Sequence, residues 1–177
     1  MNLISFVLKT PNRRIAAIAV VVMILDQLTK AIVDRFLDYA SGEKVVIPGF
    51  FKLVHWGNTG AAWSLFSNNN LLLAAIAVVA LGILYFSRHH FDVRTPASQL
   101  AFGLICGGIV GNLIDRLRVG HVVDFLYFYV QQRGGAEVGF PAFNVADSAI
   151  CTGVGLIFLL TLKSERKPKP VEPASAK

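Results

Sequence analysis

Four long apolar stretches divide the sequence and predict four helices that cross a membrane. A membrane-spanning helix needs about 20 mainly apolar residues, with a range of about 17–25. The last two stretches reach that length only if flanking polar residues extend them. The stretches are Ile15–Val33, Leu71–Ser87, Gln99–Ile114 and Ser148–Leu162. With the extensions we expect helices over about 13–33, 70–88, 97–116 and 145–163, in one domain formed by residues 1–163.

The segments between these helices predict a small β-sheet. Val45–Ile47 and Phe50–Trp56 are rich in β-formers and flank a Pro-Gly turn at 48–49, which is typical of a hairpin. His121–Val130 is almost entirely β-branched or aromatic and predicts a further strand. Gly60–Phe66 favours a short interfacial helix. We therefore expect an all-α membrane protein with four transmembrane helices, a small extracytoplasmic β-sheet and this short helix.

Composition supports a membrane protein. Hydrophobic residues make up 54% of the chain and charged residues only 16%, whereas a typical soluble domain is about 45–50% apolar and about 25% charged. The mean hydropathy is +0.57. Residues 164–177, which are rich in Pro, Lys and Glu, predict a disordered cytoplasmic tail.

The positions of the basic residues predict the orientation. The formal net charge of +6 would suit nucleic acid or anionic lipid as a partner. However, basic residues gather before the first helix, between the second and third helices, and after the fourth. The positive-inside rule then predicts that both termini are cytoplasmic and that the sheet lies on the outer face. No basic and aromatic groove indicates a nucleic-acid partner.

Polar side chains occur where lipid is expected, and such residues are costly and commonly functional. Asp26 and Lys30 are four residues apart and share a helix face. They form either an internal ion pair that holds the first helix in place near the outer interface, or a pair that supports an active site from its edge. Asn112 and Arg116 have the same spacing at the end of the third helix. They are either an interfacial cap with Arg116 snorkelling to the headgroups, or groups that orient a carbonyl or an acid.

Two acidic positions have similar alternatives. Asp124 is the only charge in a β-rich run, and is either an edge-strand charge that blocks aggregation or a functional acid. Asn144 and Asp147 open the fourth helix, where they suit the N-cap and N3 positions. Helix capping alone does not explain why these residues and the end of the third helix lie at the same outer boundary.

Asp124 and Asp147 allow aspartic-protease chemistry at this boundary. Two carboxylates within hydrogen-bond reach share one proton, because both cannot ionise. One then activates water and the other protonates the scissile carbonyl or the leaving group. This chemistry needs no cofactor, and the sequence has no Cys or His cluster with the spacing of a metal site. From position alone, Asp115 competes with Asp124 as the partner of Asp147.

The sequence resembles bacterial lipoprotein signal peptidase, the signal peptidase II family, in five blocks that occur in the family's order. The blocks are Asp26-Gln-Leu-Thr-Lys30, Asn58-Thr-Gly-Ala-Ala62, Gly107-Gly-Ile-Val-Gly-Asn-Leu-Ile-Asp-Arg116, Val122-Val-Asp-Phe125 and Phe143-Asn-Val-Ala-Asp-Ser148. The resemblance covers nearly the whole chain before the tail.

This resemblance implies a four-helix aspartyl endopeptidase of the inner membrane. Such an enzyme removes the signal peptide of a diacylglyceryl prolipoprotein by cleaving before the lipidated cysteine, and is a target of globomycin-type inhibitors. The resemblance places the catalytic pair on Asp124 and Asp147 and leaves Asp115 to a structural network. It assigns supporting roles to Asp26, Asn58, Asn112, Arg116 and Asn144, and we include Lys30 because it faces Asp26. Separately from the resemblance, we expect the protein to act as a monomer.

Two other classes of protein stay open from the residues alone. A proton-coupled transporter would use the aspartates as a relay, but it should place acids near the bilayer midplane, whereas these acids cluster at one boundary. A purely structural membrane subunit would not need two unpaired carboxylates.

Overall fold

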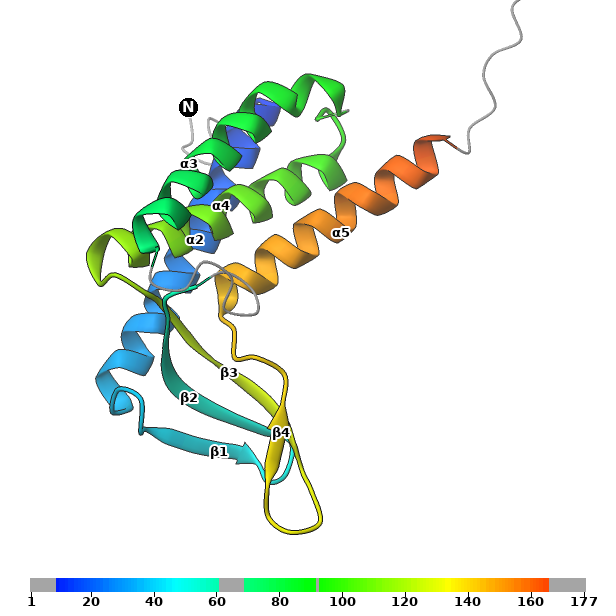
Figure 1. The fold of residues 1–177 in the computed structure, drawn as a ribbon. Helices are drawn as coiled ribbons and strands as arrows, with labels where there is room; N and C mark the ends of the chain where they lie inside the picture. The colour runs from blue at the N-terminus through cyan, green and yellow to red at the C-terminus, as the bar shows by residue number, and fades with distance from the viewer. Residues whose placement is uncertain (1–8, 61–68, 92, 166–177) are drawn as a thin grey trace, which may run out of the picture.

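The computed structural model describes residues 9–60, 69–91 and 93–165. Its long helices lie together at one end of the molecule, and a β-sheet extends from the other end (Figure 1). The helices are α2 (Pro11–Phe36), α3 (Asn70–Ser87), the short 3-10 helix η2 (Arg88–His90), α4 (Pro96–Arg118) and α5 (Val145–Glu165). The strands are β1 (Glu43–Ile47), β2 (Phe51–Asn58), β3 (Val122–Gln131) and β4 (Glu137–Gly139).

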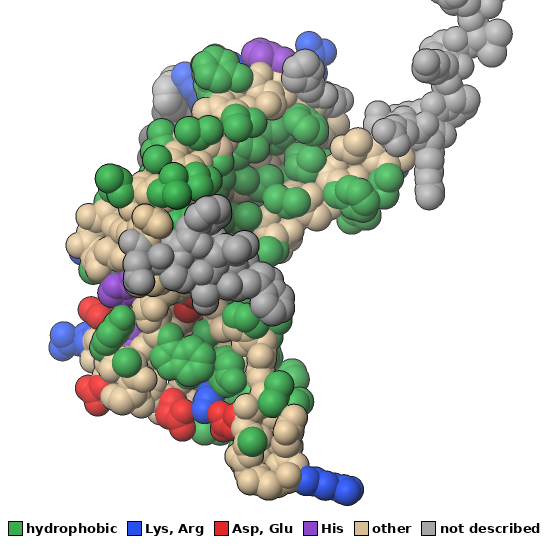
Figure 2. Space-filling view, viewed as in Figure 1, with side chains coloured by type: hydrophobic (Ala, Val, Ile, Leu, Met, Phe, Trp, Pro, Cys, Tyr) green, Lys and Arg blue, Asp and Glu red, His purple; other side chains and the backbone are tan. Residues whose placement is uncertain are grey.

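Among the described residues, four helices are long and apolar enough to cross a membrane, which confirms the predicted class of fold. Hydrophobic side chains are spread over the helical part of the molecule, whereas the acidic side chains visible on the same face lie mainly on the sheet (Figure 2). The first helix starts at Pro11, earlier than the expected residue 13. Thr10 caps it by accepting a hydrogen bond from the Arg13 amide, and Pro11 suits the first helical turn because it lacks an N–H group.

Helix α4 is the centre of the helical part, because α2, α3 and α5 all pack against it. Three glycines at four-residue spacing, Gly103, Gly107 and Gly111, allow α2 to approach closely. A Cβ atom added to any of them would lie within about 2.7 Å of an α2 atom, such as Oδ2 of Asp26 at 2.5 Å from Gly111. This close approach brings the polar residues of α2 within reach of those of α4.

We expect Gly111→Ala to destabilise the protein by about 1–3 kcal/mol, because the new methyl group overpacks a rigid helix contact. Gly155→Ala on α5 is the matched control, since a Cβ there meets nothing within 4 Å. That variant should be neutral or stabilising by up to about 1 kcal/mol, because alanine favours helix over glycine. Unfolding of both variants in detergent micelles measures the difference, and equal stabilities would contradict the packing argument.

The sheet is antiparallel with the strand order β1-β2-β3-β4. The predicted hairpin is present, with Gly49 at a φ of 74° in its turn, where glycine is favoured. Lys52 on β2 forms an ion pair with an acid on each edge strand. Its Nζ lies 2.7 Å from Glu43 on β1 and 2.8 Å from Glu137 on β4. Strand β4 was not expected, since it has only three residues and follows a glycine turn.

A β-bulge shifts the pairing of β2 with β3 by one residue. Leu53 pairs with Leu126, but beyond the bulge Trp56 pairs with Asp124. Directly paired residues share a face of the sheet, and alternate residues of a strand return to it. Asn58 therefore lies on the same face as Asp124. Without the shift, Asp124 would pair with His55, and Asn58 would point to the opposite face.

Two expectations lie outside the described residues. The short helix predicted over Gly60–Phe66 falls mainly in residues 61–68, and the predicted tail falls mainly in residues 166–177.

Candidate active site

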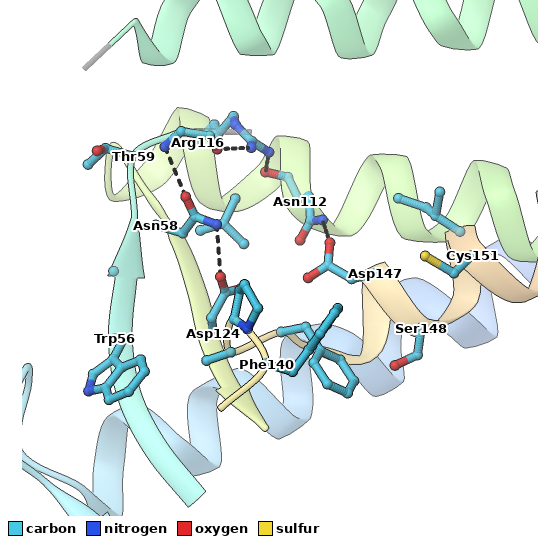
Figure 3. Close-up of a pocket in the computed structure, with 17 residues that line it drawn as sticks. Trp56, Asn58, Thr59, Asn112, Arg116, Asp124, Phe140, Asp147, Ser148 and Cys151 are labelled. Carbon is cyan, nitrogen blue, oxygen red and sulfur yellow. Dashed lines mark hydrogen bonds between the residues drawn. The ribbon is translucent and has the colours of Figure 1, made fainter. Parts of the chain in front are cut away.

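A pocket of about 770 Å³ opens where the sheet meets the ends of α4 and α5 (Figure 3). Five of the expected site residues line it: Asn58, Asn112, Arg116, Asp124 and Asp147. The other three, Asp26, Lys30 and Asn144, are buried behind it. The remaining wall is largely apolar and includes Trp56, Val122, Phe140, Phe143 and Ile150. The arrangement combines two carboxylates with a surface suited to an apolar ligand.

Asp147 is held at the first turn of α5 by a reciprocal capping box. Its backbone N–H donates to Oδ1 of Asn144 at 2.9 Å, and its Oδ2 accepts from the Asn144 N–H at 3.1 Å. Its Oδ1 accepts from Nδ2 of Asn112 at 2.7 Å. The capping role predicted for this pair is therefore real, but it leaves the carboxylate facing the pocket (Figure 3). The positive end of the helix dipole favours the ionised form of an acid at this position.

Asp124 pairs with Trp56 of β2, whereas β4 pairs only with the far end of β3, at Tyr129–Gln131. The burial and hydrogen bonds of the Asp124 side chain favour a functional acid over an exposed edge-strand charge. The side chain is 4% exposed and accepts from Nδ2 of Asn58 at 2.9 Å and Nδ2 of Asn144 at 2.8 Å. Burial raises the pKa of Asp124 to about 7, and the negative charge of Asp147 adds to the increase, while the two amide hydrogen bonds oppose it.

Asn144 connects the two acids. Its side chain is fully buried, its Nδ2 donates to Asp124, and its Oδ1 accepts from the backbone of Asp147. A single side chain therefore fixes a strand residue relative to a helix residue.

Lys30 is the centre of a buried polar network behind the pocket. Its Nζ lies 2.8 Å from Oδ2 of Asp26 and 2.7 Å from Oδ2 of Asp115, and donates to Oδ1 of Asn112 at 2.9 Å. The predicted pair of Asp26 and Lys30 is present, and Asp115 belongs to this network and does not face Asp147. All of these side chains are less than a tenth exposed, so both carboxylates depend on Lys30 as their buried cationic partner.

The two acids paired with Lys30 each hold the backbone beside one of the pocket carboxylates. Oδ1 of Asp26 accepts from the N–H of Ala146 at 2.9 Å, next to Asp147. Oδ2 of Asp115 accepts from the N–H of Val123 at 3.2 Å, next to Asp124. The network therefore sets the positions of the first turn of α5 and the start of β3 together.

Arg116 reaches across the pocket to the chain that follows β2. Its Nη2 donates to the Gly60 carbonyl at 3.1 Å, and its Nη1 donates to the Asn112 carbonyl at 3.4 Å. Its Nε is buried without a hydrogen-bond partner among the described residues. Of the two interpretations given to Arg116, the geometry favours a group that orients a carbonyl over one that snorkels to headgroups.

Sequence reasoning missed Gln27 and the apolar wall of the pocket. Nε2 of Gln27 donates to Oδ1 of Asp115 at 2.8 Å and to the Gly111 carbonyl at 3.1 Å. Its position beside Asp26 in an apolar stretch was the available signal. Phe140 and Cys151 gave no signal, because apolar side chains on a loop and on a membrane helix are common. Within the described part of the chain no group of three or more His, Cys, Asp or Glu could hold a metal ion.

The chain is similar to known bacterial proteins over most of its length. The profile of the family described as signal peptidase (SPase) II matches residues 18–163. The lipoprotein signal peptidase of Symbiobacterium thermophilum is 44% identical over 151 residues, which cover 85% of this chain and 95% of that protein. That of Geobacter metallireducens is 42% identical over 164 residues, which cover 89% and 96%.

A solved structure has the same fold. It is a bacterial membrane enzyme determined by the in meso method at 2.3 Å resolution, with a TM-score of 0.75 and 34% sequence identity. The match covers 89% of this chain and 92% of that one.

Four spanning helices that carry a two-carboxylate pocket at one end define a multi-spanning membrane enzyme. The chain belongs to the signal peptidase II family, which confirms the resemblance seen in its sequence blocks. It is therefore a peptidase and a multi-pass protein of the inner membrane.

Proposed function

We propose that the protein is an aspartic endopeptidase that removes signal peptides from diacylglyceryl prolipoproteins by cleaving before the lipidated cysteine. The observation that carries the proposal is the pair Asp124 and Asp147, which come from separate elements and line one largely apolar pocket. The names of the similar proteins supply the class of substrate. An apolar wall next to two carboxylates suits a peptide that carries lipid.

In the proposed reaction the dyad holds one proton. Asp147 is the ionised member, because it sits in the first turn of α5 and accepts two hydrogen bonds. Asp124 is the protonated member, because burial raises its pKa. Asp147 takes a proton from water as the water oxygen bonds to the scissile carbonyl carbon, and Asp124 gives its proton to the carbonyl oxygen.

The tetrahedral intermediate then collapses. Asp147 passes its proton to the amide nitrogen, the C–N bond breaks, and a hydroxyl proton of the intermediate returns to Asp124. The products are a carboxylic acid on the signal peptide and a free amino group on the lipidated cysteine. Arg116 and Asn58 support the site, and neither exchanges a proton.

The proposal includes an orientation and partners. Both termini are cytoplasmic and the pocket opens at the outer, periplasmic face, because basic residues gather at the helix ends away from the sheet. The partners are the prolipoprotein, membrane lipid and globomycin-type inhibitors. We propose that the enzyme acts as a monomer without a cofactor, a metal or nucleic acid.

The direct test incubates the purified full chain with a diacylglyceryl prolipoprotein and follows its electrophoretic mobility. We expect a shift to the mature form that globomycin blocks. The same precursor with serine in place of the lipidated cysteine should not be cleaved. Failure to cleave the lipidated precursor, or equal cleavage of both precursors, would contradict the proposal.

The pH dependence of cleavage follows from the raised pKa of Asp124. Because the dyad needs one acid protonated and the other ionised, kcat/KM should fall by about tenfold per unit as the pH rises above about 7 and should fall again at acidic pH, once Asp147 is protonated as well. The Asn58 hydrogen bond lowers the pKa of Asp124, so Asn58→Ala should move this basic limb to higher pH. A profile that stays flat to pH 9, or a limb that moves to lower pH in Asn58→Ala, would contradict the assignment.

A further inference from the structure

A second pocket of about 330 Å³ lies at the end of the helical part away from the sheet. Ala16 and Ala19 of α2 form one wall, and Leu84 and Arg88 at the end of α3 and in η2 form another. Phe102 and Cys106 of α4 also line it. The pocket lies between α2 and α3, which both pack on α4, at the end of the helices away from the sheet (Figure 1).

The depth of the pocket matches one leaflet of a bilayer. Cys106 lies ten residues beyond Pro96, the first residue of α4, and ten helical residues span about 15 Å. The hydrocarbon core of a bilayer is about 30 Å thick. The pocket therefore runs from the helix ends to about the bilayer midplane and does not approach the carboxylate pocket, which lies at the other ends of the helices.

The chemistry of the pocket changes along its length. The deep part is lined by Ala, Ile, Leu, Phe and Cys side chains, and the polar groups Asn12 and Arg88 lie at the helix ends. The Arg88 guanidinium donates to the Tyr85 carbonyl and stacks on the Tyr85 ring at 3.8 Å. Among the described residues no carboxylate pairs with Arg88, so N–H donors remain for an anion.

We propose that this pocket binds one acyl chain of an anionic phospholipid from the leaflet opposite the carboxylate site, with Arg88 donating to the headgroup phosphate. An apolar slot of single-leaflet depth with an arginine at its mouth is complementary to a phospholipid, and basic pockets between membrane helices are typical sites for anionic headgroups. The bound chain fills the space between α2 and α3 and joins these two helices.

The test is native mass spectrometry of the full chain, purified in mild detergent and incubated with phosphatidylglycerol or with phosphatidylcholine of the same acyl chains. We expect one retained phosphatidylglycerol, bound about tenfold more tightly than phosphatidylcholine. Both lipids offer a phosphate to Arg88, but the trimethylammonium group of phosphatidylcholine repels the guanidinium and cancels the charge of the phosphate. Arg88→Gln should lose this headgroup preference. Ala16→Leu, which fills the pocket from an exposed position on α2, should retain neither lipid there.

Two control variants match these changes. Arg94→Gln removes a basic residue from the same link without touching the pocket, and Ala75→Leu adds the same volume to an exposed position of α3 outside it. Both should behave as the unaltered chain. Any lipid that binds at the carboxylate pocket should bind equally in all of these variants. Differences in lipid retention between the variants therefore report on the second pocket alone.

Alkylation of Cys106 provides a measurement that needs no change in the pocket itself. In a Cys151→Ser background, phosphatidylglycerol should slow the reaction of Cys106 with N-ethylmaleimide by at least about tenfold, because the acyl chain covers the thiol. An unchanged rate overturns the proposal. Equal binding of the two lipids, or unaltered binding in Arg88→Gln and Ala16→Leu, overturns it as well. Retention of neither lipid would also overturn it, and would favour an apolar helix of another protein in this space.

Discussion

Asp124→Asn and Asp147→Asn are each expected to abolish cleavage of a lipidated precursor while the protein still inserts and folds. Asparagine has nearly the same shape as aspartate, so it retains the packing, but it can neither give nor take the proton that the reaction needs. General acid and base catalysis each contribute about 10²–10⁴-fold, and loss of one member disables both steps. We therefore expect a fall in kcat of at least about 10³-fold.

The control for this result is Asp38→Asn, because Asp38 is exposed and lies outside the pocket. It should cleave at the unaltered rate. Thermal unfolding of all three variants in detergent separates loss of chemistry from loss of structure. Normal processing by either dyad variant would exclude that residue as a catalytic group. A double variant no slower than each single one would support two acids that act as a unit.

Lys30→Met is expected to destabilise the protein by about 3–5 kcal/mol and to reduce cleavage strongly. The substitution keeps the apolar stem but leaves Asp26 and Asp115 as buried negative charges without a cation to pair with. These two acids hold the backbone at Ala146 and Val123, so their repulsion displaces the chain on both sides of the dyad. Unfolding in detergent and kcat with a lipidated precursor give the two readouts.

Charge removal distinguishes this explanation from a simple loss of packing. In a Lys30→Met background, Asp26→Asn together with Asp115→Asn removes both unpaired charges and should recover most of the lost stability. Lys44→Met is the control, since Lys44 is exposed on β1. The explanation fails if the triple variant is no more stable than Lys30→Met, or if Lys44→Met is equally destabilised.

The sequence was sufficient to predict the spanning helices because the apolar runs alone determine which segments enter a bilayer. It also predicted the cap at Asn144 and Asp147, since capping depends on neighbours along the chain. The four-residue glycine spacing in α4 is typical of a close helix contact, but it does not indicate that α2 is the partner. The long-range contacts of Lys30 could not be predicted, because they depend on how α2 and α4 are rotated against each other.

The site residues themselves came from the family blocks more than from local rules. Residue type and position left Asp115 and Asp124 equal as partners of Asp147. The structure separates them through their surroundings, since Asp115 lies against Lys30 and Asp124 against two amides beside the pocket. No periodicity in β2 indicated the bulge, which depends on pairing with a strand more than sixty residues away.

Because of the bulge in β2, the number of residues in this strand affects the site independently of which side chains the strand carries. Because successive residues of a strand alternate between faces, the number of residues between Leu53 and Trp56 determines which face Asn58 occupies. Exchange of one apolar residue for another at Val54 leaves this number unchanged, whereas loss or gain of one residue inverts the strand beyond it. A change of two residues restores the face. In this part of the chain an odd or even residue count therefore determines whether the Asn58 side chain lies on the same face of the sheet as Asp124.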